Sequence, residues 1–229
     1  MGEMIEFAVN GTSARGYLAV PETGSGPGVV VLQEWWGLNP QIKGVADLLA
    51  AEGFVALAPD LYHGELAGHD EMDKAGELMT TLPPERAARD MSGAITALLD
   101  HAAVTGEGVG VVGFCMGGML TLMIAALEGD RVIAAAPYYG APLGDGGPDW
   151  SNLSAKVEGH FAENDDFFGP EPVKALEAEL QAMGKDVTFT VHDGTGHAFA
   201  NEENALGTYD AQAAALAWAD TLELFRTSL

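Results

Sequence analysis

The chain is poor in cysteine and in positive charge, and both shortages narrow the chemistry open to it. Its 229 residues include one cysteine, which excludes an internal disulfide and a multi-cysteine zinc site. Only 10 lysines and arginines stand against 34 aspartates and glutamates, giving a formal net charge of −24 at pH 7. A surface of that sign repels phosphate backbones and anionic lipids, so we expect neither nucleic acid nor a membrane as a partner.

Long apolar runs are missing as well. No stretch of about 18 apolar residues is present to span a membrane, and the first residues do not resemble a signal peptide, so we expect a cytoplasmic protein. No two histidines have the spacing of a helical zinc motif, and we expect neither a metal nor another cofactor. The chain is 48% hydrophobic, which is enough for the core of one domain over residues 1–229. We expect this domain to be a monomer or a homodimer.

Strand-like and helix-like segments alternate along the chain. Residues 4–9 and 14–20 are predicted to form a hairpin that turns at Asn10 and Gly11. Apolar runs typical of strands buried on both faces then alternate with amphipathic segments. The predicted strands are 28–33, 54–58, 109–114, 132–138, 156–162 and 187–192, and the predicted helices are 41–52, 71–79, one opening at 83–85, 116–127, 172–183 and 208–226. This order predicts an α/β fold: a doubly wound, mostly parallel sheet with an antiparallel N-terminal hairpin.

The sole cysteine lies in the segment 113–118, Gly-Phe-Cys-Met-Gly-Gly, directly after an apolar run. A lone cysteine usually packs as a small hydrophobe, which is the structural alternative for Cys115. Its glycine neighbours instead predict a sharp strand-to-helix turn that lifts a nucleophile out of the sheet. Gly108, Gly110 and Gly113 also match a dinucleotide-binding spacing, but they precede or interrupt the strand, so we interpret that match as accidental.

An acid and a histidine follow two later strands. Asp165 comes after the run 156–162, and His197 follows the last predicted strand. With Cys115 they appear in the order nucleophile, acid, histidine that α/β-hydrolases use. His197 would take the thiol proton, and Asp165 would orient the imidazole. Taken singly, His197 fits a loop cap and Asp165 a turn residue; three such residues after three strands favour a catalytic triad.

The exit of the strand 28–33 predicts the other half of a site. Backbone N–H groups of Trp35 and of Met116, the residue after the cysteine, are the expected oxyanion-hole donors. Glu34 is either solvated at the strand end or placed beside the thiol, and the residues alone leave both options open. Four aromatic residues are candidates to line a substrate pocket: Trp35, Trp36, Tyr138 and Tyr139. Core packing is their ordinary role, and we expect it for at least half of them.

These residues resemble the dienelactone hydrolase family of α/β-hydrolases, whose members open the enol-lactone ring of carboxymethylenebutenolides through a cysteine nucleophile. The resemblance covers essentially the whole chain and rests on five segments: 33–39, 58–62, 113–118, 164–167 and 196–199. It implies a carboxylic ester hydrolase with a triad of Cys115, Asp165 and His197. It also implies that Glu34 interacts with the thiol and helps control its ionisation.

One position departs from the family pattern. The family's lactone hydrolases hold the substrate carboxylate with arginines, one of them four residues after the catalytic histidine, where this chain has Asn201. Asparagine does not replace a bidentate arginine clamp. We therefore expect an ester or lactone hydrolase similar to dienelactone hydrolase. The alternatives are a broad-specificity carboxylesterase or thioesterase, and a non-catalytic thiol sensor on the same scaffold.

Overall fold

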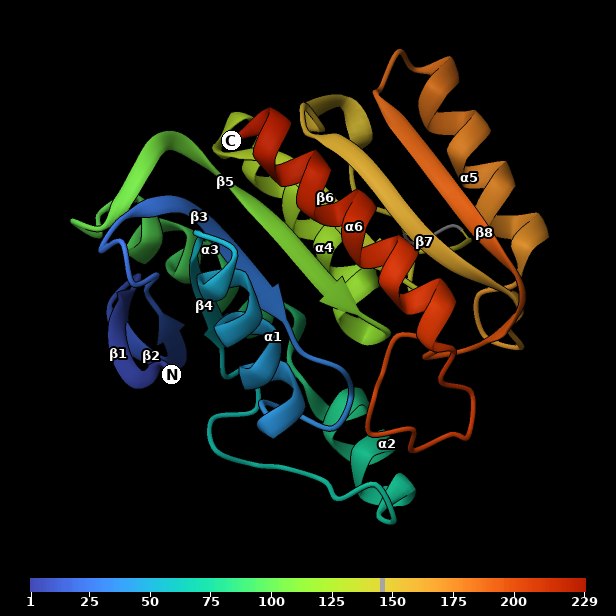
Figure 1. The fold of residues 1–229 in the computed structure, drawn as a ribbon, viewed down its shortest axis with the longest axis horizontal. Helices are drawn as coiled ribbons and strands as arrows, with labels where there is room; N and C mark the ends of the chain where they lie inside the picture. Colours follow the sequence, from blue (N-terminus) through green and yellow to red (C-terminus); the bar gives the residue numbers. More distant parts are fainter. Residues whose placement is uncertain (145–146) are drawn as a thin grey trace. The chain divides into compact units, whose positions relative to one another are not determined.

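The computed structural model describes residues 1–144 and 147–229, so part of the loop predicted over 140–150 lies outside the described residues. The chain divides into two compact units, Met1–Val111 and Val112–Leu229. The boundary falls inside strand β5 (Val104–Phe114), which therefore contributes to both units (Figure 1). The single domain expected over 1–229 stays a prediction.

The first unit is built on a mixed sheet with the strand order β1-β2-β4-β3-β5. Its strands are β1 (Glu3–Val9), β2 (Thr12–Ala19), β3 (Gly26–Leu32), β4 (Val55–Pro59) and the first part of β5. Strand β2 is antiparallel to β1 and to β4, whereas β3 and β4 are parallel. The predicted N-terminal hairpin and the first β-α-β unit are therefore confirmed.

A glycine makes the hairpin turn possible. Val9 pairs with Thr12, which leaves Asn10 and Gly11 in the turn, and Gly11 has a φ of +87°. Such a backbone carries little steric cost only where no Cβ is present. The Asn-Gly pair thus sets the register of β1 against β2.

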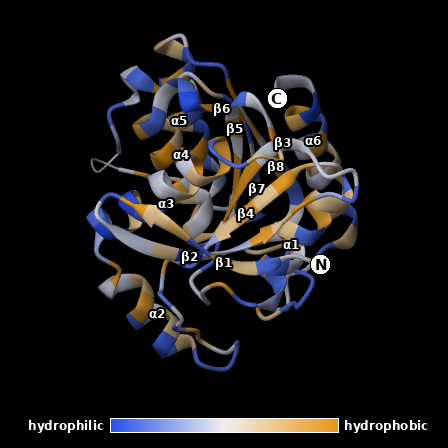
Figure 2. Ribbon diagram, turned by 90° about the vertical axis from the view of Figure 1, so that its left-hand side faces the viewer, coloured by the Kyte–Doolittle hydropathy of each residue, from blue (hydrophilic) through white to orange (hydrophobic). Residues whose placement is uncertain are grey.

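Three helices accompany these strands: α1 (Pro40–Ala51), α2 (Met72–Thr81) and α3 (Pro84–Leu99). Helix α1 begins where it does because the Asn39 side chain accepts a hydrogen bond from the N–H of Ile42 at 3.0 Å. Ile42, Ala46 and Leu49 form its buried face. Figure 2 shows α1 and α3 on opposite sides of the strands, with β4 mostly hydrophobic between them.

The second unit contains the strand order β5-β6-β7-β8, with parallel pairing of β6 to β7 and of β7 to β8. Its further elements are α4 (Met116–Glu128), η1 (Gly129–Arg131), β6 (Val132–Tyr138), η2 (Trp150–Asn152), β7 (Lys156–Asn164), α5 (Pro170–Ala182), β8 (Val187–Gly196) and α6 (Ala211–Ser228). Helices α4 and α5 lie on one side of these strands and α6 lies on the other (Figure 2). Helices on both faces of a mostly parallel sheet confirm the predicted α/β architecture.

Three element boundaries differ from the prediction by three residues or more. Strand β5 begins at Val104 rather than 109. The apolar run does not reveal its first residues, because these are largely exposed and need no apolar side chains. Strand β8 continues to Gly196 beside β7, past a bulge between Ala162 and Asn164. Helix α6 begins at Ala211 rather than 208, because the Asp210 side chain caps it. None of the described helices is long and apolar enough to cross a membrane.

Candidate active site

Cys115 occupies a strained turn between β5 and α4. Its backbone has φ +56° and ψ −116°, a conformation that L residues rarely adopt. Such strain costs about 1–3 kcal/mol and persists only where the surroundings hold it. Here the N–H of Cys115 donates to the carbonyl of Tyr138 at 3.0 Å. The turn therefore has the strand-to-helix geometry of a nucleophile elbow, with a half-buried thiol at its apex.

Two glycines allow this turn to pack closely. A Cβ on Gly113 would lie 2.2 Å from the carbonyl oxygen of Gly117, and a Cβ on Gly140 would lie 1.9 Å from that of Cys115. Both contacts are with backbone atoms, which cannot move aside without distorting the elbow. Sequence reasoning does not single out Gly140, although a glycine directly after an apolar strand signals a close approach of backbones.

The thiol also lies at the start of a helix. Cys115 is the residue before α4, and its carbonyl accepts hydrogen bonds from Gly118 at 2.9 Å and from Met119 at 3.2 Å. The positive end of the helix dipole favours a negative charge at this position. Cys115 therefore lies where the partial positive charge of the first turn of α4 is concentrated.

Asp165 and His197 form a buried pair after β7 and within the turn that follows β8. Nδ1 of His197 lies 2.8 Å from Oδ2 of Asp165, and the side chains are 10% and 0% exposed, respectively. The other carboxylate oxygen accepts the N–H groups of Phe167 at 2.8 Å and Phe168 at 3.0 Å. Three donors thus hold this carboxylate.

The pKa of Asp165 reflects these opposing influences. Burial by itself raises the pKa of the carboxyl, but the hydrogen bond and charge of His197 lower it, as do the amides of Phe168 and Phe167. The net pKa lies below the ordinary value for aspartate. An ionised carboxylate accepts only, so Nδ1 of neutral His197 carries the hydrogen and Nε2 is left as the basic nitrogen.

The end of β6 contacts both halves of this arrangement. The carbonyl of Tyr138 holds the N–H of Cys115, while the ring of Tyr139 lies 5.3 Å from the ring of His197, centroid to centroid. Tyr139 has a φ of +34°, and its N–H donates to the carbonyl of His160 at 2.7 Å. The same strand end therefore supports the cysteine turn and the histidine.

The two tyrosines predicted to line a pocket are buried in the second unit. Tyr138 is 1% exposed, and its hydroxyl lies 2.8 Å from Oγ1 of Thr221 on α6. Burial raises its pKa, against the opposing effect of the Thr221 hydrogen bond. Tyr138 therefore packs in the core, as expected for at least half of the aromatic candidates, and Tyr139 contacts His197 with its ring edge.

Glu34, Trp35 and Trp36 belong to the first unit. Glu34 is 2% exposed, which contradicts the solvated alternative and leaves a buried carboxylate at the exit of β3. Its carbonyl accepts from the N–H of Gly37 at 3.2 Å in a turn. Trp36 is buried between Trp35 and His69, with ring centroids 5.0 Å and 4.9 Å away. The roles of these residues toward Cys115 stay predictions.

A family model, described as the dienelactone hydrolase family, matches residues 14–229. The chain belongs to the dienelactone hydrolase family. Among relatives of this family member, "Protein usf" of Aquifex pyrophilus is 37% identical over 235 residues, covering 100% of both chains. A protein of Aquifex aeolicus named "Putative carboxymethylenebutenolidase" is also 37% identical, with the same coverage.

The fold comparison leads to the same family. The solved structure of the "Dienelactone Hydrolase-like Promiscuous Phosphotriesterase P91", from metagenomic libraries, has a TM-score of 0.85 and 25% identity. The match covers 100% of this chain and 98% of that one. This dienelactone hydrolase family member therefore has the α/β-hydrolase fold, and it is a hydrolase by family.

The position that departs from the family pattern is buried. Asn201 is 2% exposed, and its side-chain oxygen accepts the N–H of Glu203 at 3.0 Å. Its own N–H donates to the carbonyl of Ala198, which has a φ of +63°. Asn201 thus stabilises the turn after His197 in the place where the family's clamp would need an arginine.

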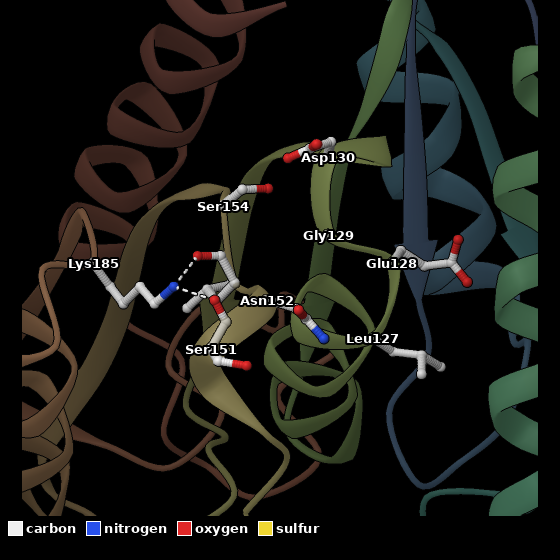
Figure 3. A pocket seen from close by; sticks show the side chains of 9 residues that line it. Leu127, Glu128, Gly129, Asp130, Ser151, Asn152, Ser154 and Lys185 are labelled. Carbon is white, nitrogen blue, oxygen red and sulfur yellow. Dashed lines mark hydrogen bonds between the residues drawn. The ribbon is translucent and has the colours of Figure 1, made fainter.

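Positive charges of the second unit bind their own neighbours. Lys156 pairs with Glu158 at 2.7 Å, Lys174 pairs with Glu177, and Arg131 pairs with Glu128. Lys185 donates to the carbonyls of Ser151 and Leu153 at the rim of a polar depression of about 460 Å³ (Figure 3). This depression lies at the amino ends of β6 and β7, the opposite edge from Asp165 and His197.

Three cations of the first unit, Lys74, Arg86 and Arg89, also have partners within it. Lys74 lies 3.9 Å from Glu71, Arg89 contacts Asp90, and Arg86 donates to the carbonyl of Leu61 at 3.4 Å. Nε of Arg86 is buried without a hydrogen-bond partner.

Within residues 1–144 and 147–229, no group of three or more His, Cys, Asp or Glu is arranged to hold a metal ion.

Proposed function

We propose that this protein hydrolyses a carboxylic ester or lactone through Cys115, with His197 as the base and Asp165 as its orienting acid. The observation that supports it best is the strained backbone of Cys115 at a strand-to-helix turn, in the same compact unit as the buried Asp165 and His197 pair. A structural cysteine does not need such a turn. A thiol at the apex of such a turn would be within reach of a substrate carbonyl, which supports the proposal.

The reaction would run in two halves. Nε2 of His197 takes the thiol proton, and the sulfur of Cys115 attacks the carbonyl carbon, which puts a negative charge on the carbonyl oxygen. The N–H of Met116, with that of Trp35, would stabilise this oxyanion. The bond to the leaving oxygen breaks, and this oxygen takes the proton from His197. Water, deprotonated by His197, then attacks the thioester, releasing the acid and restoring the thiol.

Glu34 would influence the first proton transfer. A carboxylate buried at a strand exit is costly to keep ionised unless it has a charged or donating partner. Beside a thiol it would compete with His197 for the proton and so set the fraction of thiolate before substrate binds. Glu34→Gln is the variant that removes this charge while keeping the shape.

The partners of several described polar and charged residues in the triad's own unit bear on the substrate class. Asn201 is engaged in a turn, and Lys156, Lys174 and Lys185 bind elsewhere. A carboxylate on the substrate would therefore find no partner among these four residues. This favours a neutral ester or lactone over the carboxylated dienelactone.

We further propose that the enzyme works in the cytoplasm as a monomer or homodimer, without a cofactor. A catalytic thiol stays reduced in such a compartment. The net charge of −24 disfavours nucleic acid and anionic membranes as partners. Its partner would be a small ester or lactone.

The test compares wild type, Cys115→Ala and Cys115→Ser on activated esters, a neutral lactone and dienelactone. We expect wild type to show a burst of acyl-enzyme, and we expect Cys115→Ala to lose at least about 10³-fold in kcat. Equal rates in wild type and Cys115→Ala would contradict the proposal. Rapid iodoacetamide labelling of Cys115 with no acyl-enzyme on any substrate would instead favour the thiol sensor.

A further inference from the structure

Phe167 is an exposed aromatic ring held directly against the proposed base. Its side chain is 68% exposed, yet its ring centroid lies 5.1 Å from that of His197 at an interplanar angle of 60°. Phe168 lies nearly parallel to the same imidazole, 5.9 Å away. A single exposed hydrophobic residue is ordinary on a protein surface. One that touches a catalytic imidazole calls for a functional account.

The position of Phe167 is also fixed. Its N–H donates to Oδ1 of Asp165 at 2.8 Å, while Oδ2 of the same carboxylate holds Nδ1 of His197. One carboxylate therefore sets both the imidazole and the backbone that carries the exposed ring. Such a ring offers an apolar contact without a large loss of conformational freedom on binding.

The proton transfers identify which part of a substrate would meet this ring. Nδ1 of His197 is occupied by Asp165, so Nε2 is the atom that protonates the leaving oxygen. Proton transfer needs a distance of about 3 Å between these two atoms. The carbon attached to the leaving oxygen must then lie close to the imidazole, and Phe167 is an exposed ring that packs against this imidazole.

We infer that Phe167 determines specificity for the leaving alcohol or enol, as distinct from the acyl group, and that it favours aromatic or bulky apolar leaving groups. This inference rests on the proposed function. The neighbouring charge is negative, because Asp166 is exposed and adjacent in the chain. An anionic leaving group is therefore disfavoured at this place, and an apolar face on the leaving group would cover the ring.

The test varies the two sides of the ester separately in wild type and Phe167→Ala. One series keeps the acetyl group and changes the alcohol from methyl to phenyl to 2-naphthyl; the other keeps 4-nitrophenol and lengthens the acyl chain. We expect Phe167→Ala to lower kcat/KM about tenfold for 2-naphthyl acetate and less than about twofold for methyl acetate. The loss should be constant along the acyl series. Phe167→Trp should restore the preference for naphthyl.

Leu216→Ala is the matched control, because Leu216 is an exposed apolar side chain on α6 with 55% exposure. It should leave both series unchanged. An equal loss by Phe167→Ala on every ester would assign the ring to support of His197 and overturn the inference. A loss that grows with acyl length would overturn it as well, because the ring would then contact the acyl group.

A binding measurement separates this inference from the proposed function. Ligand-observed NMR would follow 2-naphthol binding to Cys115→Ala and to the Cys115→Ala, Phe167→Ala double variant, neither of which needs turnover. We expect the double variant to bind at least about fivefold more weakly. Equal binding by both would overturn the role of Phe167. Turnover that does not depend on Cys115 would instead remove the proposed function.

Discussion

In the second unit, one buried histidine is paired with an acid and another is paired with a second histidine. Nδ1 of His197 is bound to Asp165 at 2.8 Å, whereas Nδ1 of His160 faces Nε2 of His192 at 3.3 Å. Burial, and then the charge of His192, lowers the pKa of His160 to about 3. Burial also lowers the pKa of His192, although nearby aspartates oppose it.

The difference shows what a buried imidazole needs in order to act as a base. A carboxylate both selects the tautomer and stabilises the imidazolium that forms when the proton is taken. A second imidazole carries no negative charge to stabilise the imidazolium, and two positive charges at this distance repel. His197 therefore has a partner that can stabilise its positive form, whereas His160 is suited to stay neutral inside the core.

Removing the acid from the first pair should have the largest effect. In Asp165→Asn the amide would donate to Nδ1 and force the hydrogen onto Nε2, the nitrogen that we propose accepts the thiol proton. We expect a loss of about 10³ to 10⁴ in kcat, measured with an activated ester. Far-UV circular dichroism should be unchanged, which separates this loss from misfolding. More than a tenth of wild-type activity would mean that His197 does not need its acid.

The pair of His160 and His192 should lower the free energy of unfolding at acid pH. Unfolded histidine binds a proton below about pH 6.5, whereas folded His160 does so only near 3. The unfolded state therefore binds more protons in this window, and stability falls as the pH falls through it. We expect His160→Gln to flatten this dependence by up to about 1.4 kcal/mol per pH unit, measured by urea unfolding between pH 7 and 4.5.

Two points bear on how the pH dependence of His160→Gln is interpreted. Asp165 contributes to acid sensitivity with the same sign, because its lowered pKa gives a stabilisation that is lost as the pH drops through that pKa. That loss lies below the ordinary range of aspartate and so outside the measured window. The reference variant is His101→Gln. If the free energy of unfolding of His160→Gln changes with pH as steeply as that of the reference, His160 is not kept neutral by the fold.

The smallest effect is expected from the hydroxyl that joins the second pair to the core. Oγ1 of Thr221 lies 2.8 Å from the hydroxyl of Tyr138 and 3.4 Å from Nε2 of His160. We expect Thr221→Val to lower the free energy of unfolding by about 1 kcal/mol while kcat changes less than about twofold. A large fall in kcat without a change in stability would mean that the second pair takes part in catalysis.

Local signals explain why so much of this molecule is predictable. Asn10 with Gly11, the Asn39 cap, and the apolar runs of the buried strands each act within a few residues, so the elements follow from the chain itself. The elbow is predictable for the same reason, because glycines flank Cys115. Asp165 and His197 are predictable by type and order, since each follows the end of a strand.

Other features depend on residues distant in sequence. The segment 132–140 does not identify Cys115 as the residue whose carbonyl lies against Gly140. Histidine content likewise does not tell His160, which faces His192 across two strands, from His197, which faces Asp165. The exposed ring of Phe167 beside His197 is of the same kind.

The sequence by itself determines the alternation of strands and helices, the cysteine turn, and the acid and histidine that follow later strands. Tertiary structure alone decides which histidine receives an acid, that Glu34 is buried, and that Tyr138 packs in the core. The physical reason is the separation along the chain over which each influence acts. Backbone preferences and caps act between neighbours, whereas burial, pKa and ring contacts depend on side chains brought together from different strands.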